Sequence, residues 1–579
     1  MKRLIPLAAL LLMSCSSVSP DLPPPPATST AYDIVVRGGT IYDGSGGKPY
    51  KGDVAILRGY IVKVGKFPGR GAREIDASGK AVAPGFINML SWANESLIAD
   101  GRGLSDLKQG VTLEVMGEGS SMGPWNAAMI AQETERQGDV KYPITWTTLG
   151  GYLEAMEKKG VGPNVASMIG AETARTHVLG EGDVYPTPQQ LAAMRGLVVQ
   201  AMEEGALGVG SSLIYAPGSY AETDELVALA SEAGRCGGIY VSHMRYESDR
   251  LLDGIDELIE ISRRSGAPGE IWHLKAAGRT NWGKLDAAIA RIEAARVSGL
   301  RITANMYTYT AGSTGFDAAM PPWVQAGGRE AWIARLKDPA TRARVIAEMR
   351  DPKAPYENLY RHAGAEGTIM VGFRTEALKS LTGRTLADYA KEKGVSPEDA
   401  MIDLVIADGS RVQVVYFLMS EDNVKRQTAL PWMSFGSDAA ALAPEGVFLK
   451  SSTHPRAYGN FARVLGKYAR DEKSLTLPDA IRRLSAMPAH NLGLRDRGRI
   501  AETYRADVVV FDPDTVGDHA TYDNPRQYAT GVSEVIVNGV LSLEKGEPTG
   551  KLGGQVVRGR AWSGYADGGC RKSAKDWSW

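Results

Sequence analysis

Short apolar segments alternate with amphipathic stretches rich in Ala, Leu, Glu and Arg along most of the chain. Eight of these segments have the length and apolar content of buried strands, and most are followed by a helical pattern. They span residues 85–91, 111–117, 165–171, 206–213, 238–244, 270–276, 301–309 and 433–439. Eight alternations of strand and helix predict an α/β fold, a (β/α)8 TIM barrel, over residues 84–499.

The rest of the chain falls into an insertion and two terminal parts. The seventh and eighth segments are separated by residues 310–432, far more than an ordinary loop, so we expect a largely helical insertion over about 314–367 that covers the rim. Short β-rich runs occur near both termini, and Asn538-Gly539 is a typical hairpin turn. They predict one small β-sandwich built from residues 32–83 and 500–555, followed by a C-terminal tail over 556–579.

The first residues have the pattern of an export signal. Lys2 and Arg3 precede an apolar core too short for a permanent membrane helix, and Leu12-Met13-Ser14-Cys15 resembles a bacterial lipobox. That resemblance implies a signal peptide over 1–14, lipidation of Cys15 and a proline-rich tether over 15–31. The expected location is the cell envelope, with the lipid anchored in the outer membrane and the protein facing the periplasm. The alternative is an ordinary signal peptide with a chance cysteine.

The charge balance and the cysteine content bear on two further properties, nucleic-acid binding and disulfide formation. The chain has 66 Lys and Arg against 67 Asp and Glu, which argues against a general electrostatic attraction to nucleic acid. Beyond Cys15 only Cys236 and Cys570 remain. Because they are so far apart in the sequence, we expect no disulfide framework, and we interpret Cys236 as a small buried apolar residue.

Candidate chemistry is concentrated where three of the predicted strands end. His243 and His273 lie at or near the ends of the fifth and sixth segments, and Asp438 lies at the end of the eighth. The carboxyl ends of barrel strands meet at one rim, and two neutral imidazoles with a carboxylate suit a catalytic zinc or similar ion. Four other histidines match no ligand position and are interpreted as structural: His177, His362, His490 and His519.

Ordered motifs along the chain resemble a known family. They include Val-Ala-Pro-Gly-Phe-Ile-Asn at 82–88, Ser-His-Met-Arg-Tyr-Glu at 242–247, His-Leu-Lys at 273–275, Gly-Ser-Asp at 436–438 and His-Pro-Arg-Ala-Tyr-Gly at 454–459. Over about residues 32–547 the chain resembles the amidohydrolase superfamily, and within it the N-acyl-D-amino-acid deacylases, or D-aminoacylases. The resemblance implies a barrel with a sandwich, a divalent metal and hydrolysis of an amide-like bond.

The chain departs from the family at two metal positions. The His-x-His that commonly ends the first strand is replaced by Leu90 and Trp92, and neither side chain can bind a metal, so a second metal position is expected to be empty or very weak. A metal-binding cysteine after the second strand is matched, with a one-residue deletion, by Glu118. A carboxylate is an acceptable zinc ligand, so the resemblance implies one Zn²⁺ held by Glu118, His243 and His273. The alternative for Glu118 is a solvated loop carboxylate.

The expected reaction uses a metal-activated water with Asp438 as general base, although Asp438 could instead cap a following helix. The resemblance assigns substrate contacts to Lys275, Tyr307 and Ser313. Tyr215 would line the same pocket, and Arg456 would clamp a carboxylate through its planar fork.

The leading hypothesis is an amidohydrolase that cleaves the linear amide of an N-acyl-D-amino acid or a similar small peptide-like substrate. One alternative is a cyclic amidase of the hydantoinase or dihydroorotase kind. A second alternative, suggested by the apolar Leu90 and Trp92, is a catalytically inactive barrel that binds a ligand.

Overall fold

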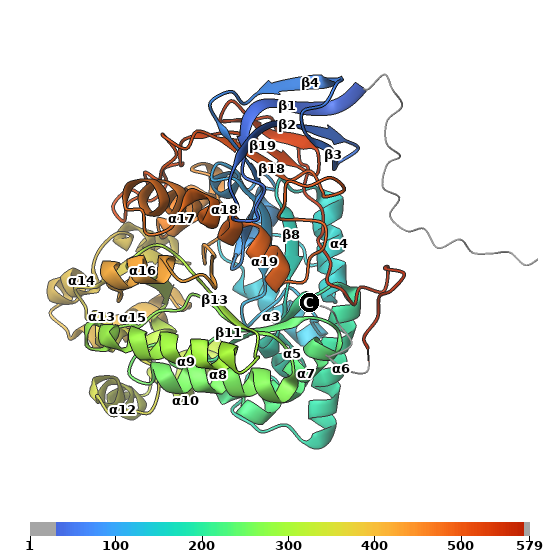
Figure 1. Cartoon of the computed structure of the whole chain (residues 1–579). Helices are drawn as coiled ribbons and strands as arrows, with labels where there is room; N and C mark the ends of the chain where they lie inside the picture. Colours follow the sequence, from blue (N-terminus) through green and yellow to red (C-terminus); the bar gives the residue numbers. More distant parts are fainter. Residues whose placement is uncertain (1–30, 572–579) are drawn as a thin grey trace, which may run out of the picture.

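The computed structural model describes residues 31–571 (Figure 1). The predicted signal peptide, the lipidated Cys15 and nearly all of the predicted tether lie outside the described residues. Among residues 31–571, no helix is both long enough and apolar enough to cross a membrane.

A closed parallel barrel forms the centre of the molecule. Its strands are β6 (Phe86–Asn88), β7 (Val111–Met116), β8 (Asn164–Ser167) continued by β9 (Ile169–Gly170), β10 (Gly208–Ser212), β11 (Ile239–His243), β12 (Gly269–Ile271), β13 (Ile302–Met306) and β17 (Met433–Phe435). Parallel pairing runs from β6 to β8 and from β9 to β17. A parallel bridge between Ser91 and Ala439 joins the first strand to the last. The predicted fold class, a barrel with a terminal β-domain, is confirmed.

Helices surround the barrel, and the longer ones present an apolar stripe to the strands. In α8 (Leu251–Ser265), Leu251, Ile255, Leu258 and Ile261 are buried at helical spacing, and α6 (Pro188–Glu204) begins with a capping box at Thr187. The other barrel-side helices are α1 (Ala93–Ala99), α2 (Leu104–Leu107), α3 (Ala127–Arg136), α4 (Leu149–Lys159), α5 (Ala171–Leu179), α7 (Thr223–Arg235), α9 (Leu285–Val297), α16 (Glu421–Thr428), α17 (Arg456–Arg463), α18 (Leu477–Leu484) and α19 (Ala486–Asn491).

Both ends of the chain contribute to one sheet, seen at the top of Figure 1 where the blue and red strands lie side by side. Its strands are β1 (Ala31–Ile41), β2 (Tyr50–Leu57), β3 (Tyr60–Gly65), β4 (Arg70–Asp76), β5 (Ala81–Pro84), β18 (Val508–Phe511), β19 (Val532–Val537), β20 (Val540–Glu544) and β21 (Glu547–Pro548). The antiparallel pairing of β5 with β18 joins the two halves. Asn538 and Gly539 both have positive φ and turn β19 into β20, as the hairpin pattern predicts.

The insertion between β13 and β17 is larger than predicted and is not mainly helical throughout. It contains an antiparallel sheet of β14 (Ala311–Gly315), β15 (Thr368–Gly372) and β16 (Gln413–Phe417). Its helices are α10 (Pro322–Gln325), α11 (Arg329–Leu336), α12 (Pro339–Arg350), α13 (Leu359–Ala363), α14 (Leu386–Lys393) and α15 (Pro397–Asp408). The range 314–367 was therefore too short. The Ala-Gly-Ser-Thr-Gly sequence of β14 has little intrinsic strand preference, and its conformation comes from pairing with β16.

The expectation of no disulfide was wrong, because Cys236 and Cys570 are bonded, with Cα atoms 4.1 Å apart. Residues 556–571 run back across the amino-terminal rim of the barrel, where Val556 bridges Val165 and the backbone N–H of Gly559 donates to Gly205 at 2.9 Å. The two cysteines are 334 positions apart in sequence. A large separation in sequence therefore does not imply a large separation in space.

Replacing Cys236 by Ser should destabilise the protein by roughly 2–5 kcal/mol, because the bond closes a very long loop and restricts the unfolded chain. The measurement is chemical denaturation of protein produced from Ser16 onward, with and without a thiol reductant. Cys570→Ser and the double variant should lose the same amount. Equal stability of the wild type and all three variants would contradict this role.

Candidate active site

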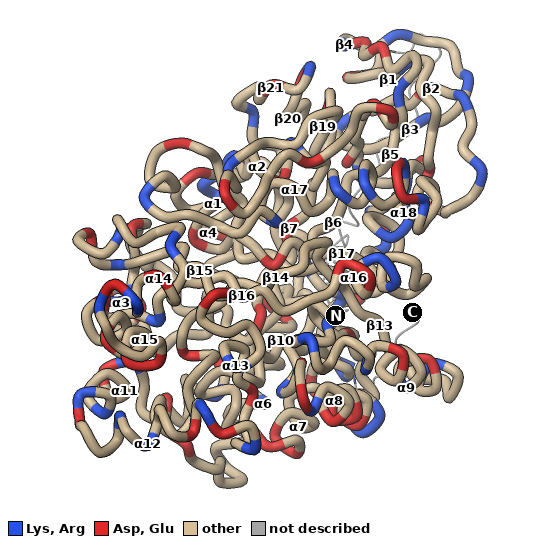
Figure 2. Tube along the Cα trace, turned by 90° about the vertical axis from the view of Figure 1, so that its left-hand side faces the viewer, with Lys and Arg blue, Asp and Glu red and all other residues tan. Residues whose placement is uncertain are grey.

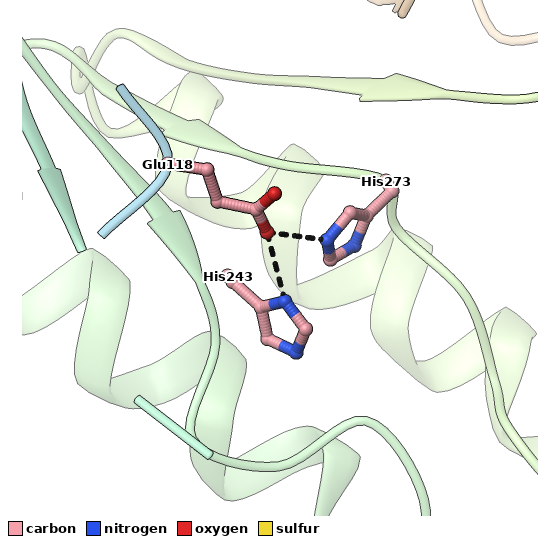
Figure 3. Close-up of side chains that lie close together, drawn as sticks. All are labelled: Glu118, His243 and His273. Atoms are coloured by element: carbon pink, nitrogen blue, oxygen red, sulfur yellow. Dashed lines mark hydrogen bonds and ion pairs between the residues drawn. The ribbon is translucent and has the colours of Figure 1, made fainter. Parts of the chain in front are cut away.

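Three buried side chains, at or just after the carboxyl ends of β7, β11 and β12, converge at one rim of the barrel (Figure 3). The Glu118 Oε1 atom lies 2.9 Å from His243 Nδ1 and 3.0 Å from His273 Nε2. Their ligand atoms all lie within 4.8 Å of one another. Glu118 is 4% exposed, so it is not a solvated loop carboxylate. Two imidazole nitrogens and one carboxylate oxygen form a donor set that fits zinc and leaves a position for water or substrate.

The backbone conformation around Glu118 and His273 directs their side chains into the site. Gly117 and Gly119 flank Glu118 with positive φ, and a Cβ on Gly117 would lie 2.4 Å from the carbonyl oxygen of Met168. His273 itself has φ of 37°, a rare value for a non-glycine residue, and its backbone N–H donates to Asn305 Oδ1 at 2.9 Å. Such strained conformations are concentrated at functional sites.

Charges alternate in sign through this buried group. Burial alone would raise the pKa of Glu118, but hydrogen bonds from His243 and His273 outweigh it and hold that pKa well below its ordinary range. Burial likewise opposes ionisation of Glu247, but the charges of Lys275 and the histidines lower its pKa. For His273, burial and Lys275 lower the pKa, whereas Glu247 and Glu118 raise it to about 9. A divalent cation that binds His273 near neutral pH must therefore displace a proton.

Glu247 lies behind both histidines and was missed by the sequence interpretation. Its Oε1 is 3.0 Å from His273 Nδ1 and 2.7 Å from Lys275 Nζ, and its Oε2 is 3.6 Å from His243 Nε2. Carboxylates in this position fix the tautomer and orientation of metal-binding histidines. The spacing of four residues between His243 and Glu247 was the available signal, but it predicts an approach only if the chain turns after β11.

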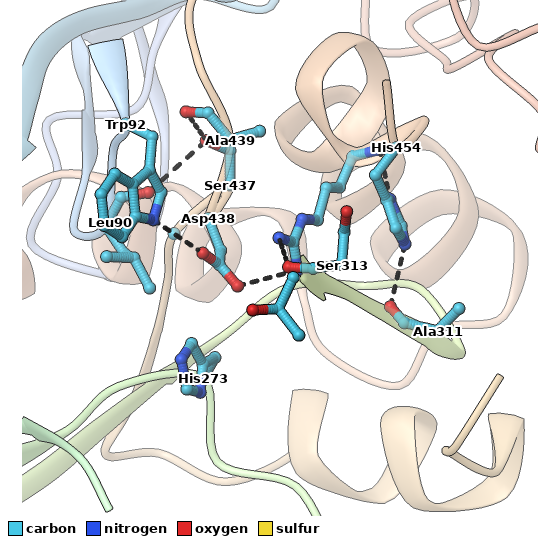
Figure 4. A network of polar contacts seen from close by, with 12 residues as sticks. Leu90, Trp92, His273, Ala311, Ser313, Ser437, Asp438, Ala439 and His454 are labelled. Carbon is cyan, nitrogen blue, oxygen red and sulfur yellow. Dashed lines mark hydrogen bonds and ion pairs between the residues drawn. The ribbon is translucent and has the colours of Figure 1, made fainter. Parts of the chain in front are cut away.

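Asp438 lines the same cavity as the triad and is held from three sides (Figure 4). Its backbone N–H donates to the carbonyl of Leu90 at 2.9 Å, and its φ is 50°. The Trp92 indole N–H donates to Oδ1 at 3.1 Å, and Arg456 Nη1 lies 2.8 Å from Oδ2. Burial raises the pKa of Asp438, although the charge of Arg456 opposes this shift.

The predicted substrate contacts surround a cavity of about 660 Å³. Lys275 is buried and paired with Glu247, and the Tyr307 ring lies 4.4 Å from the Arg456 guanidinium carbon. Ser313 lies on β14 of the insertion, and its carbonyl accepts from Arg456 Nη2 at 3.4 Å. The Tyr215 ring packs 5.2 Å from the ring of His243. All five predicted contacts, Lys275, Tyr307, Ser313, Tyr215 and Arg456, therefore line one cavity.

His454 orients Arg456 and was also not assigned from the sequence. Its Nδ1 accepts the backbone N–H of Arg456 at 3.0 Å, so Nε2 carries the proton and donates to the carbonyl of Ala311 at 2.9 Å. Burial and the charge of Arg456 hold the pKa of His454 well below its ordinary value. This neutral histidine ties the loop after β17 to the insertion.

Acidic and basic residues are interspersed along the described trace (Figure 2). The whole sequence carries a formal net charge of −1. The electrostatics of the cavity are therefore set by its local groups and not by a large field of one sign.

Comparison with known proteins agrees with this geometry. Residues 73–542 match the model described as the amidohydrolase family, and the chain belongs to that family. An N-acyl-D-glutamate deacylase of Alcaligenes xylosoxydans xylosoxydans is 30% identical over 528 residues, covering 90% of this chain and 96% of the relative. The predicted family resemblance is confirmed.

Two solved structures are similar along the same length, each with a TM-score of 0.75, 28% identity and coverage of 91% of this chain and 100% of the other. One is a D-aminoacylase studied for the functional role of its binuclear metal centre, with one-metal activation and second-metal attenuation. The other is an N-acyl-D-glutamate deacylase from Bordetella bronchiseptica, complexed with zinc and a phosphonate inhibitor that mimics the tetrahedral intermediate of the reaction.

Glu247→Gln should weaken zinc binding about 10- to 100-fold, because the amide lacks the negative charge that faces both histidines and has only one acceptor oxygen to hold His273 Nδ1. Competition with a zinc chelator measures this. Glu172→Gln is the matched control, since burial raises the pKa of Glu172 to about 8 and its carboxyl is mostly protonated at neutral pH. If Glu247→Gln bound zinc as tightly as Glu172→Gln, this result would show that Glu247 does not orient the ligands.

Proposed function

We propose that this protein is a metal-dependent deacylase that hydrolyses the linear amide bond of an N-acyl-D-amino acid or a similar small peptide-like compound. The observation that carries the proposal is the buried group of Glu118, His243 and His273, with Asp438 on the wall of the same cavity. Similarity to deacylases over nine tenths of the chain supports the linear amide as substrate.

The metal is proposed to be one zinc ion per chain, held by Glu118, His243 and His273. When bound, such an ion lowers the pKa of a water to about 7 and polarises a carbonyl group. The donor types support zinc over magnesium or calcium, which prefer oxygen ligands.

The protein's own groups would move the protons and hold the substrate. Asp438 accepts a proton from the attacking water and delivers it to the departing nitrogen, a role suited to a carboxylate whose pKa burial has raised. The Nε atom of Arg456 has no hydrogen-bond partner within the described part of the chain, while its Nη1 and Nη2 atoms contact Asp438 and the carbonyl of Ser313. Together with Tyr307 and Ser313, the Arg456 guanidinium is proposed to bind the substrate carboxylate.

Cyclic amides and a purely binding role are less well supported. An inactive barrel would have no need for a charged triad, because each buried charge costs free energy unless it is paired. A cyclic amidase remains the second hydrolase hypothesis, and hydantoins in the substrate panel distinguish it from the deacylase.

N-acetyl-D-amino acids should be hydrolysed, with their L-enantiomers as controls. His273→Ala should lose both zinc and turnover, because it removes a ligand from the triad. Asp438→Asn should keep the zinc but lose about 10²- to 10⁴-fold in kcat, since only proton transfer is removed. Elemental mass spectrometry and amine release are the two measurements. No turnover across acyl amino acids and dipeptides, with one zinc per chain in place, would contradict the deacylase proposal.

We also propose that the protein is lipid-anchored in the cell envelope. The N-terminal pattern around Cys15 supports this proposal, and so does the Cys236–Cys570 disulfide, because such bonds persist in oxidising compartments and not in the bacterial cytoplasm.

Cys15→Ser should move the protein from the membrane fraction to the soluble fraction, because it removes the acceptor of the lipid. Fractionation of bacterial cells that express the full chain, followed by immunoblotting, measures the distribution. Ser14→Ala, one residue earlier, is the control that keeps the acceptor. Full membrane association of Cys15→Ser would contradict lipid anchoring at this residue.

A further inference from the structure

The indole N–H of Trp92 lies within hydrogen-bond distance of two carboxylates. Its Nε1 lies 2.9 Å from Glu118 Oε2. The same atom lies 3.1 Å from Asp438 Oδ1 (Figure 4). The backbone N–H of Trp92 also donates to the carbonyl of Ala439 at 3.0 Å, so the indole is tied to the loop that carries Asp438. The side chain is 42% exposed and lines the cavity.

The carboxylates of Glu118 and Asp438 make the position between them favourable for a positive group. Glu118 directs Oε1 to the histidines, and its Oε2 accepts from the Trp92 indole, which also donates to Asp438. Two anionic oxygens that converge on one point attract a cation or a hydrogen-bond donor, and without either they repel each other. The indole N–H is the donor found there. Because an indole nitrogen is a donor only, it cannot also serve as a metal ligand.

Leu90, two residues before Trp92, supplies no metal ligand either. Leu90 is fully buried and packs inside the barrel with Val115, Met168 and Trp272. These two positions correspond to the His-x-His of the family resemblance, and a related D-aminoacylase has a binuclear centre with second-metal attenuation. The residues of this chain therefore do not fit a second ion beside the first.

We propose that the Trp92 indole N–H replaces a second metal ion, bridging Glu118 and Asp438. It keeps the site at one zinc, makes hydrolysis insensitive to excess zinc, and acts as a positioning residue for Asp438. The inference rests on the proposed metal-dependent hydrolysis, but the number of bound ions is measured without any substrate.

The first experiment counts zinc by elemental mass spectrometry after equilibration with excess zinc and gel filtration. The wild type and Trp92→Phe should hold one ion, because Phe removes the donor and adds no ligand. Trp92→His with Leu90→His should hold two. If the double variant does not fold, Trp92→His alone serves, since position 92 is partly exposed while Leu90 is in the core. Two ions in the wild type, or one ion in a folded double variant, would overturn the proposal.

The second experiment measures kcat and KM separately. Trp92→Phe should lower kcat about tenfold and leave KM within about twofold, because Asp438 loses a donor that holds it in place. Trp323→Phe is the matched control: it removes an indole N–H that donates to Glu348 at 2.8 Å, outside the cavity, and should leave kcat unchanged. An unchanged kcat in Trp92→Phe would exclude the positioning role.

Excess zinc separates this inference from the deacylase proposal. Wild-type turnover should stay constant as zinc rises, whereas the Leu90→His and Trp92→His double variant should be attenuated. Attenuation of the wild type by excess zinc would overturn the inference and leave the deacylase proposal intact. One bound zinc per chain without turnover of any acyl amino acid would overturn the deacylase proposal and leave the inference about Trp92 intact.

Discussion

The buried carboxylate of Glu118 is the interaction on which the rest of the site depends. A carboxylate that is 4% exposed remains ionised only where donors and opposite charges replace water. His243 and His273 supply them on one oxygen and Trp92 on the other. Glu247 then balances the histidines. The shape of the site is therefore set by a chain of paired charges, and each member is costly to remove alone.

The barrel provides the rigidity that this charge arrangement needs. His273 and Asp438 both have left-handed backbone conformations, and each is held by a backbone N–H bond, to Asn305 Oδ1 and to the carbonyl of Leu90. Those contacts hold strained residues at the ends of strands whose own positions are fixed by parallel pairing. The insertion adds the opposite wall through Ser313, and Arg456 contacts both sides. The cavity therefore brings Arg456 and Asp438 together on one side of the buried triad.

Much of this could be predicted from the residues. The eight barrel strands were recognised because buried strands are short, apolar and bounded by turns, and His243, His273 and Asp438 were recognised because they follow such strands. Glu118 was found through the family resemblance and the ability of a carboxylate to bind zinc. Glu247 was missed because its role depends on where the chain turns after β11, which no local pattern encodes.

The sequence by itself determined the order of the barrel strands and helices, the terminal β-domain and the type of residue at each barrel-strand end, because these follow from periodicities between near neighbours. Only the tertiary structure decided that Cys236 meets Cys570, that β14 pairs with β16, and that the N–H of Trp92 lies between two carboxylates. Each of these contacts joins residues far apart in the chain. Their formation depends on the path of the whole backbone, which local composition does not specify.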